Sequence, residues 1–259
     1  MIRRATDTSS LTGWTVVSLR PRGQHAALRA AAARVGATLL ALSPLAIEPR
    51  TDVASRRALR DALAADVVLF TSPNAVRAAA ALRRLGNARG RPVLAVGEGT
   101  RRALQRLGVD ALSPTRMDSE GLLAMPALCE VGGRSIGLVT APGGRNRLAP
   151  ALQARGAEVR RADVYDRVPV AIADARWQAL ATLLATPEHV VLALSSTEAL
   201  DAVLRQRPAT LEKSLRRIAV TAASERLAQA ARAAGFRRIA IATDARPASL
   251  LRAAANAFV

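Results

Sequence analysis

Small hydroxyl side chains follow two apolar runs of the sequence, where a strand is expected to end and a helix to begin. The pair Thr71-Ser72 follows Val67–Phe70, and the pair Ser195-Ser196 follows a second run of five apolar residues. Such a hydroxyl can cap the helix, or it can bind a carboxylate beside the positive end of the helix dipole. Glycines or small hydroxyls recur at four further junctions: Arg20 to Gly23, Gly97 to Thr100, Thr140 to Gly144 and Thr221 to Ser224. The set predicts anion binding at helix N-termini, with capping alone as the alternative for each residue.

Conventional catalytic groups are scarce in this sequence. His25 and His189 are the only histidines, neither HExxH nor GxSxG occurs, and the acidic residues are dispersed. These facts exclude a His-rich metal site and disfavour a Ser-His-Asp triad or a paired-carboxylate mechanism. We expect both histidines at the surface, and Cys129, the single cysteine, buried as a small apolar side chain. An enzyme with this sequence would work by positioning and charge stabilisation.

Alternating strand and helix patterns must position these junctions. The apolar runs Trp14–Leu19 and Pro92–Val96 predict strands, and His25–Val35 and Thr100–Leu107 predict helices, each closed by a glycine. Glycine is common after the last residue of a helix because it adopts the left-handed conformation without strain. The alternation predicts an α/β fold with parallel sheets flanked by helices, whose ligands bind outside the carboxyl ends of the strands.

The sequence contains an internal repeat. The segments that begin at Gly13 and at Gly133 match without a gap at an offset of 120 positions. Matched pairs along them are Gly23 with Gly143, Leu28 with Leu148, Gly36 with Gly156, Ala37 with Ala157, and Pro49 with Pro169. Later segments match with small shifts that place Thr100 opposite Ser224. Because glycine marks specific backbone geometry, we predict two similar α/β halves whose carboxyl edges face each other across a cleft.

The chain is strongly basic. Its formal net charge is +18, and the positive residues are nearly all Arg and are scattered along the chain. We interpret this as compositional bias together with an acidic small ligand. Aromatic residues make up 2% of the chain, which argues against stacking on nucleic-acid bases. A nucleic-acid-binding module and a non-catalytic two-lobed binder of an anionic small molecule stay as alternatives.

The cellular compartment is predicted from segments that the sequence lacks. Residues 1–10 are polar, so no signal peptide is expected, and no apolar run approaches the roughly 20 residues that span a bilayer. A single cysteine allows no intrachain disulfide, which is typical of a reducing compartment. We therefore expect a cytoplasmic protein that has no membrane partner.

An ordered series of motifs resembles the uroporphyrinogen-III synthase family: "FTSPNAV", "AVGEGTRRALQRLGVDALSP", "DSEGLL" and "GLVTAPGGRNRLAPALQARGAEVRRADVYDRVP". No motif is diagnostic alone, but the series covers nearly the whole chain. The resemblance implies two α/β domains joined by a two-stranded linker. Domain 1 would consist of residues 1–43 and 171–259, and domain 2 of residues 44–170, including the linker strands 44–49 and 165–170.

The same resemblance implies an activity. The family is a lyase that cyclises hydroxymethylbilane to uroporphyrinogen III, with loss of water and inversion of ring D, in tetrapyrrole and heme biosynthesis. It implies a linear tetrapyrrole polycarboxylate as the small-molecule substrate and no metal or other cofactor. We also expect no nucleic-acid partner and a monomer.

Site residues follow from the resemblance one position at a time. Tyr165, in "DVYDRVP", would help to protonate the leaving hydroxyl, with interdomain packing as its alternative role. The implied substrate-binding residues are Thr71, Ser72, Thr100, Ser119, Glu120, Ser195, Ser196 and Ser224. Arg20 and Arg145 are added as anchors because a guanidinium can bind a carboxylate bidentately. The sequence departs from the family pattern at Ser196, which replaces a proline, and at Thr221, which replaces a glycine.

Overall fold

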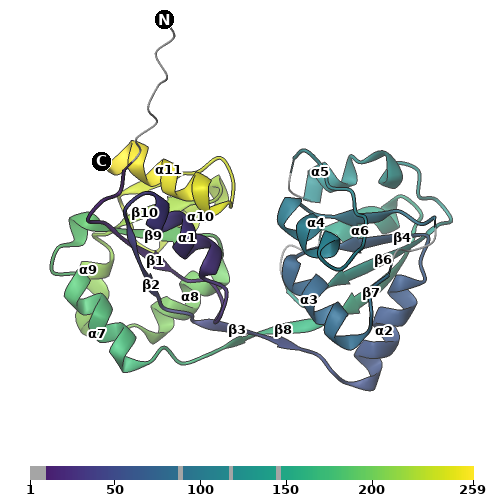
Figure 1. Ribbon diagram of the computed structural model, residues 1–259, viewed down its shortest axis with the longest axis horizontal. Coiled ribbons are helices and arrows are strands. Elements are labelled where there is room, and N and C mark those ends of the chain that lie inside the picture. Colours follow the sequence, from purple (N-terminus) through teal and green to yellow (C-terminus); the bar gives the residue numbers. More distant parts are fainter. Residues whose placement is uncertain (1–9, 87–89, 117–118, 144–146) are drawn as a thin grey trace, which may run out of the picture. The chain divides into compact units, whose positions relative to one another are not determined.

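The structure is a computed structural model of the 259-residue chain and describes residues 10–86, 90–116, 119–143 and 147–259. It divides into two compact units: unit 1 combines the residues up to Ala46 with Val168–Val259, and unit 2 is Ile47–Arg167. In Figure 1 the purple N-terminal and yellow C-terminal parts of the chain accordingly lie together in unit 1. The sequence-based boundaries assigned both linker strands to the second domain, whereas the two units divide within those strands.

Unit 1 contains a five-stranded parallel sheet in the order β11-β10-β9-β1-β2. The strands are β1 (Thr15–Ser18), β2 (Thr38–Ala41), β9 (Val190–Leu194), β10 (Ala219–Ala222) and β11 (Ile239–Ile241). The α-helices around it are α1 (Ala26–Arg34), α7 (Asp174–Leu183), α8 (Thr197–Gln206), α9 (Glu212–Leu215), α10 (Glu225–Ala233) and α11 (Pro247–Phe258). Thr15 of β1 pairs with Thr38 on one side and with Val190 on the other. The sheet therefore needs both ends of the chain.

Apolar clusters cover both faces of this sheet. Val16 packs in one cluster with Leu28 of α1 and Leu250 of α11. Val17 packs in the other cluster with Leu180 of α7. Successive strand residues point to opposite faces, so both valines are buried although they are neighbours. Strands that are covered on both sides explain why the sequence shows continuous apolar runs instead of alternation.

Unit 2 contains a four-stranded parallel sheet in the order β5-β4-β6-β7. The strands are β4 (Val67–Phe70), β5 (Val93–Ala95), β6 (Ser135–Thr140) and β7 (Glu158–Asp163). The α-helices are α2 (Val53–Leu63), α3 (Pro73–Leu82), α4 (Glu98–Gln105), α5 (Ser119–Leu123) and α6 (Leu148–Ala154). Phe70 pairs with Val139, so β4 and β6 end side by side. Helix α4 begins before the predicted start at Thr100, because Gly97 already occupies the N-cap position.

Two strands form a separate two-stranded sheet that links the units, β3 (Leu45–Pro49) and β8 (Tyr165–Pro169) (Figure 1). They occupy matching positions of the 120-residue repeat. Arg50 follows β3 and binds Asp166 of β8 through two hydrogen bonds of 2.8 and 2.9 Å. Both strands end at a proline, which has no N–H group to donate to a further sheet partner. The predicted fold class, parallel sheets flanked by helices with a two-stranded linker, is confirmed.

The expectation for Cys129 is wrong. The cysteine is exposed and follows a short 3-10 helix, Pro126–Leu128, with its Sγ 3.4 Å from the carbonyl oxygen of Met125. The neighbouring Leu128 is fully buried and fills the apolar site instead. Which of two adjacent residues faces the core depends on the turn geometry at this point, and composition does not encode that geometry.

Strand β10 carries a buried hydroxyl without a partner. Thr221 is fully buried, and within the described ranges its Oγ1 has no hydrogen-bond partner. The sequence alignment placed Thr221 opposite Gly97, but in the structure Gly97 is the N-cap of α4 and Ser224 is the N-cap of α10. Thr221 lies three residues before Ser224, inside β10, so its hydroxyl is enclosed by the sheet and the helices that cover it. A buried hydroxyl without a partner costs about 1–3 kcal/mol.

We expect Thr221→Val to raise the free energy of unfolding by about 1 kcal/mol, because valine keeps the shape and removes the unsatisfied oxygen. Chemical denaturation of the two proteins measures the difference. Thr38→Val is the matched control: this strand threonine keeps a hydroxyl contact to Thr15 of 2.9 Å, so its loss should not stabilise. A Thr221→Val protein less stable than the parent would show that the hydroxyl has a partner.

Glu98 forms a charged cap in the first turn of α4. Its carboxylate accepts hydrogen bonds from Arg101 at 2.7 and 2.8 Å and from Arg102 at 2.7 Å. The bond to Arg101, followed by that to Arg102, lowers the pKa of the Glu98 carboxyl from its ordinary 4.5 to about 2. A carboxylate in this turn also complements the positive end of the helix dipole.

Because this pKa is lower in the folded chain, the charged group stabilises the fold fully above pH 4.5 and loses that effect as the pH falls toward 2. We expect the parent to be more stable than Glu98→Gln at neutral pH, and the difference to shrink over that window. Denaturation at a series of pH values measures it. Glu48→Gln, at an exposed carboxylate of the same unit, is the control and should show no such trend. A Glu98 carboxyl that titrates near pH 4.5 by NMR contradicts the prediction.

Candidate functional site

Two threonines meet at the carboxyl edge of the unit 2 sheet. Thr71 directly follows β4, and Thr140 is the last residue of β6. The Thr71 hydroxyl donates to the Thr140 hydroxyl at 2.8 Å, and the Thr71 N–H donates to the carbonyl oxygen of Val139 at 3.2 Å. The register between the two strands places these residues together. Both side chains are half-buried, so this edge carries polar groups that stay within reach of solvent.

Ser72 has two roles in the local structure. Its Oγ accepts a hydrogen bond from the Ala75 N–H at 3.0 Å and so caps α3, whose first residue is Pro73. The same Oγ lies 3.1 Å from the phenolic oxygen of Tyr165. The sequence offered helix capping and ligand contact as alternatives for this residue. Capping is observed, and the hydroxyl also contacts the residue that was singled out as catalytic.

Tyr165 is the first residue of β8 and is held from two sides. The ring is buried, and the Arg167 Nη1 donates to the phenolic oxygen at 3.4 Å. The Arg167 guanidinium carbon also lies 5.9 Å from the ring centroid. Its Nη2 donates to the carbonyl oxygen of Pro142 at 2.7 Å, which fixes the guanidinium in place. The phenol therefore sits between a serine hydroxyl and a cation.

Arg167 was not identified from the sequence, although a signal was available. Residues two positions apart on a strand point to the same face, and Arg167 follows Tyr165 at that spacing within β8. The motif "DVYDRVP" therefore contains both the phenol and its guanidinium partner. The spacing predicts their proximity once the segment is recognised as a strand.

Three other predicted residues of unit 2, which the structure describes, have contacts elsewhere. Thr100 is buried in the first turn of α4. Ser119 begins α5, and Glu120 beside it accepts a hydrogen bond from Arg147 at 2.8 Å. The carboxylate of Glu120 thus pairs with an arginine. Arg145 lies outside the described residues, so its role stays a prediction.

In unit 1 the second serine pair begins α8. The Ser196 Oγ accepts a hydrogen bond from the Ala199 N–H at 3.2 Å, so this residue caps the helix as Ser72 does in unit 2. Ser195 is exposed. Ser224 precedes α10, but its hydroxyl makes no capping hydrogen bond, whereas its carbonyl oxygen accepts from the N–H groups of Leu227 and Ala228. The cleft expected between the two halves stays a prediction.

Arg20 lies just beyond the carboxyl end of β1 in unit 1. Its side chain is half-buried, and no described residue forms an ion pair or side-chain hydrogen bond with the guanidinium. Burial lowers the pKa of this group from its ordinary value. A cation that is partly removed from water and has no carboxylate beside it is suited to bind an anion.

The surface position expected for His25 is wrong, whereas His189 is exposed as predicted. The His25 Nδ1 lies 2.9 Å from the Ser18 Oγ, and its Nε2 lies 2.7 Å from the Ser43 Oγ. Burial is the main cause that lowers the pKa of His25, and the charges of neighbouring arginines add to it. The ring is therefore neutral at neutral pH and links the end of β1 to the segment before the linker.

The described ranges contain neither a cluster suited to a metal ion nor a helix suited to a membrane. No group of three or more His, Cys, Asp or Glu side chains there is arranged to hold a metal ion. None of the helices in those ranges combines the length and apolarity needed to cross a bilayer.

Solved structures share this fold. The uroporphyrinogen-III synthetase of Helicobacter pylori aligns with a TM-score of 0.62 and 15% identity, over 94% of this chain and 99% of that one. A mutant uroporphyrinogen III synthase of Thermus thermophilus aligns with a TM-score of 0.58 and 22% identity, over 94% of this chain and 98% of that one. At such identities the likeness establishes the fold alone.

Sequence relatives extend the likeness beyond the fold. The uroporphyrinogen-III synthase of Salmonella typhimurium is 34% identical over 200 residues, which is 73% of this chain and 78% of that protein. The Escherichia coli protein of the same name is 33% identical over 166 residues, covering 61% of this chain and 65% of its own length. A family model described as "Uroporphyrinogen-III synthase HemD" matches residues 26–252. These matches do not favour a non-catalytic binder, and they confirm the resemblance drawn from the motif series: the chain belongs to the uroporphyrinogen-III synthase family.

Proposed function

We propose that this chain cyclises hydroxymethylbilane to uroporphyrinogen III, with loss of one water molecule and inversion of ring D. Family membership supports the reaction. The structural observation that carries the proposal is the contact between Tyr165, Ser72 and Arg167 at the carboxyl edge of unit 2. A lyase class, a cytoplasmic location, a monomeric state and a reaction without cofactor are parts of the same proposal.

The proposed role of Tyr165 is proton transfer to the leaving group. Its phenol gives a proton to the terminal hydroxyl of the substrate, which leaves as water and creates an electrophilic azafulvenium cation. The Arg167 guanidinium, 3.4 Å from the phenolic oxygen, would offset the negative charge on that oxygen. The Ser72 hydroxyl at 3.1 Å could donate to the same atom. Both contacts support a tyrosine that exchanges a proton during the reaction.

Ring inversion is proposed to follow from attack by the substituted carbon of the last ring. A spiro intermediate forms, fragments and recloses with that ring inverted. The ring carbon that closes the macrocycle loses a proton, which returns to the phenolic oxygen, so the net change is the loss of water. Proton transfer alone does not determine which isomer forms, because ring inversion depends on how the linear substrate is folded while it is bound.

The carboxylates of the substrate are proposed to bind at helix N-termini. In unit 2 the N-terminus of α3 lies beside Ser72 and Thr71, and in unit 1 the N-terminus of α8 lies beside Ser196. The serine hydroxyls and the positive end of the helix dipole favour anions there. Arg20, which has no carboxylate partner among the described residues, would add a charge-assisted anchor.

The reaction is tested by supplying hydroxymethylbilane and separating the isomers of the product. We expect type III above the type I isomer that forms spontaneously without enzyme. Heat-denatured protein provides the background measurement. Formation of type I alone, at the background rate, would contradict the proposed function.

We expect Tyr165→Phe to lower kcat about a hundredfold with a smaller change in KM, because general acid catalysis contributes at least that factor. The variant removes one oxygen and keeps the buried ring. Asp166→Asn is the control. Asp166 is adjacent to Tyr165 in the sequence, but its side chain contacts Arg50, so it can be changed without altering the phenol. If Tyr165→Phe retains the parent kcat, the proton-transfer role is wrong, although type III formation would still support the function.

A further inference from the structure

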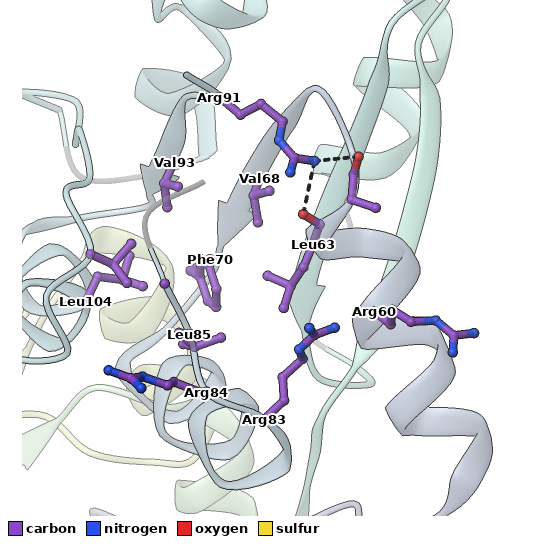
Figure 2. A pocket seen from close by; sticks show the side chains of 13 residues that line it. Arg60, Leu63, Val68, Phe70, Arg83, Arg84, Leu85, Arg91, Val93 and Leu104 are labelled. Carbon is purple, nitrogen blue, oxygen red and sulfur yellow. Dashed lines mark hydrogen bonds between the residues drawn. The ribbon is translucent and has the colours of Figure 1, made fainter. Parts of the chain in front are cut away.

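Unit 2 contains a pocket that the proposed reaction does not use. A pocket of about 320 Å³ lies between the end of α2, the segment after α3, the start of β5 and α4 (Figure 2). Its lining residues are Arg60, Leu63, Ala64, Val68, Phe70, Arg83, Arg84, Leu85, Gly86, Arg91, Val93, Leu104 and Val109. Neither Ser72 nor Tyr165 is among them. The volume falls within the range of small-ligand pockets, roughly 300–1,000 Å³.

The floor of this pocket is apolar. Val68, Phe70 and Val93 contribute it from β4 and β5, and Leu104 contributes from α4. All four belong to one apolar cluster of unit 2 and are almost completely buried. Figure 2 shows them gathered on one side, with the arginine side chains around them. An apolar floor of this kind favours the hydrocarbon part of a ligand.

Charged groups around the floor are of one sign. The lining contains four arginines and no acidic residue. Arg91 is occupied, because its Nη1 donates to the carbonyl oxygens of Ala64 at 2.8 Å and Leu63 at 3.5 Å at the end of α2. The Arg60 Nε lies 3.5 Å from a carboxylate oxygen of Asp61. Two of the four cations are therefore engaged with the protein itself.

Arg83 is the cation that remains for a ligand. It follows the last residue of α3, and no described residue forms an ion pair or side-chain hydrogen bond with it. Figure 2 shows its guanidinium directed toward Leu63, whereas the side chain of Arg84 extends to the left, away from Leu63. A guanidinium beside apolar surface binds carboxylates strongly because little water competes for it.

We propose that this pocket binds a small amphipathic carboxylate, with its hydrocarbon part on the Val68, Phe70 and Leu104 floor and its carboxylate on Arg83. The combination of an unpaired cation directed toward Leu63 and a buried apolar floor specifies an anionic head on an apolar body. A sugar or a free phosphate has no hydrocarbon part to pack on the apolar floor, and an uncharged lipid has no carboxylate to bind Arg83. The inference does not depend on the proposed reaction.

The probe for this site is decanoate, used below the concentration at which it forms micelles. We expect calorimetric titration of the full chain to show one bound decanoate, and NMR to show shifts of the Leu85 and Leu104 methyl groups. Arg83→Met should weaken binding about tenfold or more, because it removes a charge-assisted hydrogen bond and keeps the length of the side chain. Arg83→Lys should retain most of the binding.

Arg84→Met is the matched control, since it removes the same charge from the neighbouring position and should bind decanoate as the parent does. Decanol tests the need for the anionic head and should bind at least tenfold more weakly than decanoate. The arginines are exposed, so circular dichroism should show all variants folded. Equal binding by the Arg83→Met and Arg84→Met proteins, equal binding of decanol and decanoate, or no binding of decanoate would each overturn the proposal.

Discussion

Parallel strand pairing is the constraint on which both units depend. Because all strands of a sheet run in one direction, they end at one edge, and the helices that follow them begin there. In unit 2 the pairing of Phe70 with Val139 brings Thr71 next to Thr140. Hydroxyls and positive dipole ends are thus concentrated at that edge by topology. A substrate that carries many carboxylates matches what such an edge offers.

Local signals explain how much of the fold could be predicted from the sequence. The strand Val67–Phe70 and the match between β3 and β8 were predicted correctly, because apolar runs, turn residues and the repeat are encoded locally. Contacts between residues that are far apart in the sequence were harder to predict. Ser72 and Tyr165 were each chosen by resemblance, but their contact spans 93 positions and requires β8 to lie beside α3. His25 was misjudged for the same reason, since Ser18 and Ser43 enclose it only after β1 and β2 pair.

The two halves of the repeat have diverged where chemistry is proposed. Ser72 and Ser196 both cap the helix after their strand, so the structural role of the serine is shared. The first residue of β8 is Tyr165, whereas the first residue of β3, which matches it in the repeat, is the buried Leu45. A phenol therefore faces the capping serine in one half only. A duplicated scaffold thus gives two similar serine-capped edges, and Tyr165 in place of a leucine makes one of them different.

The discontinuity of unit 1 has a consequence for the order of folding during synthesis. The ribosome releases β1 and β2 first, but β1 pairs with β9, which emerges after the whole of unit 2. Unit 2 is contiguous, and its two ends are joined through β3 and β8, so it can fold as an inserted domain while β1 waits with one edge unpaired. The segment of β1, α1 and β2 therefore has an unpaired strand edge until β9 emerges, and an unpaired edge of this kind favours aggregation.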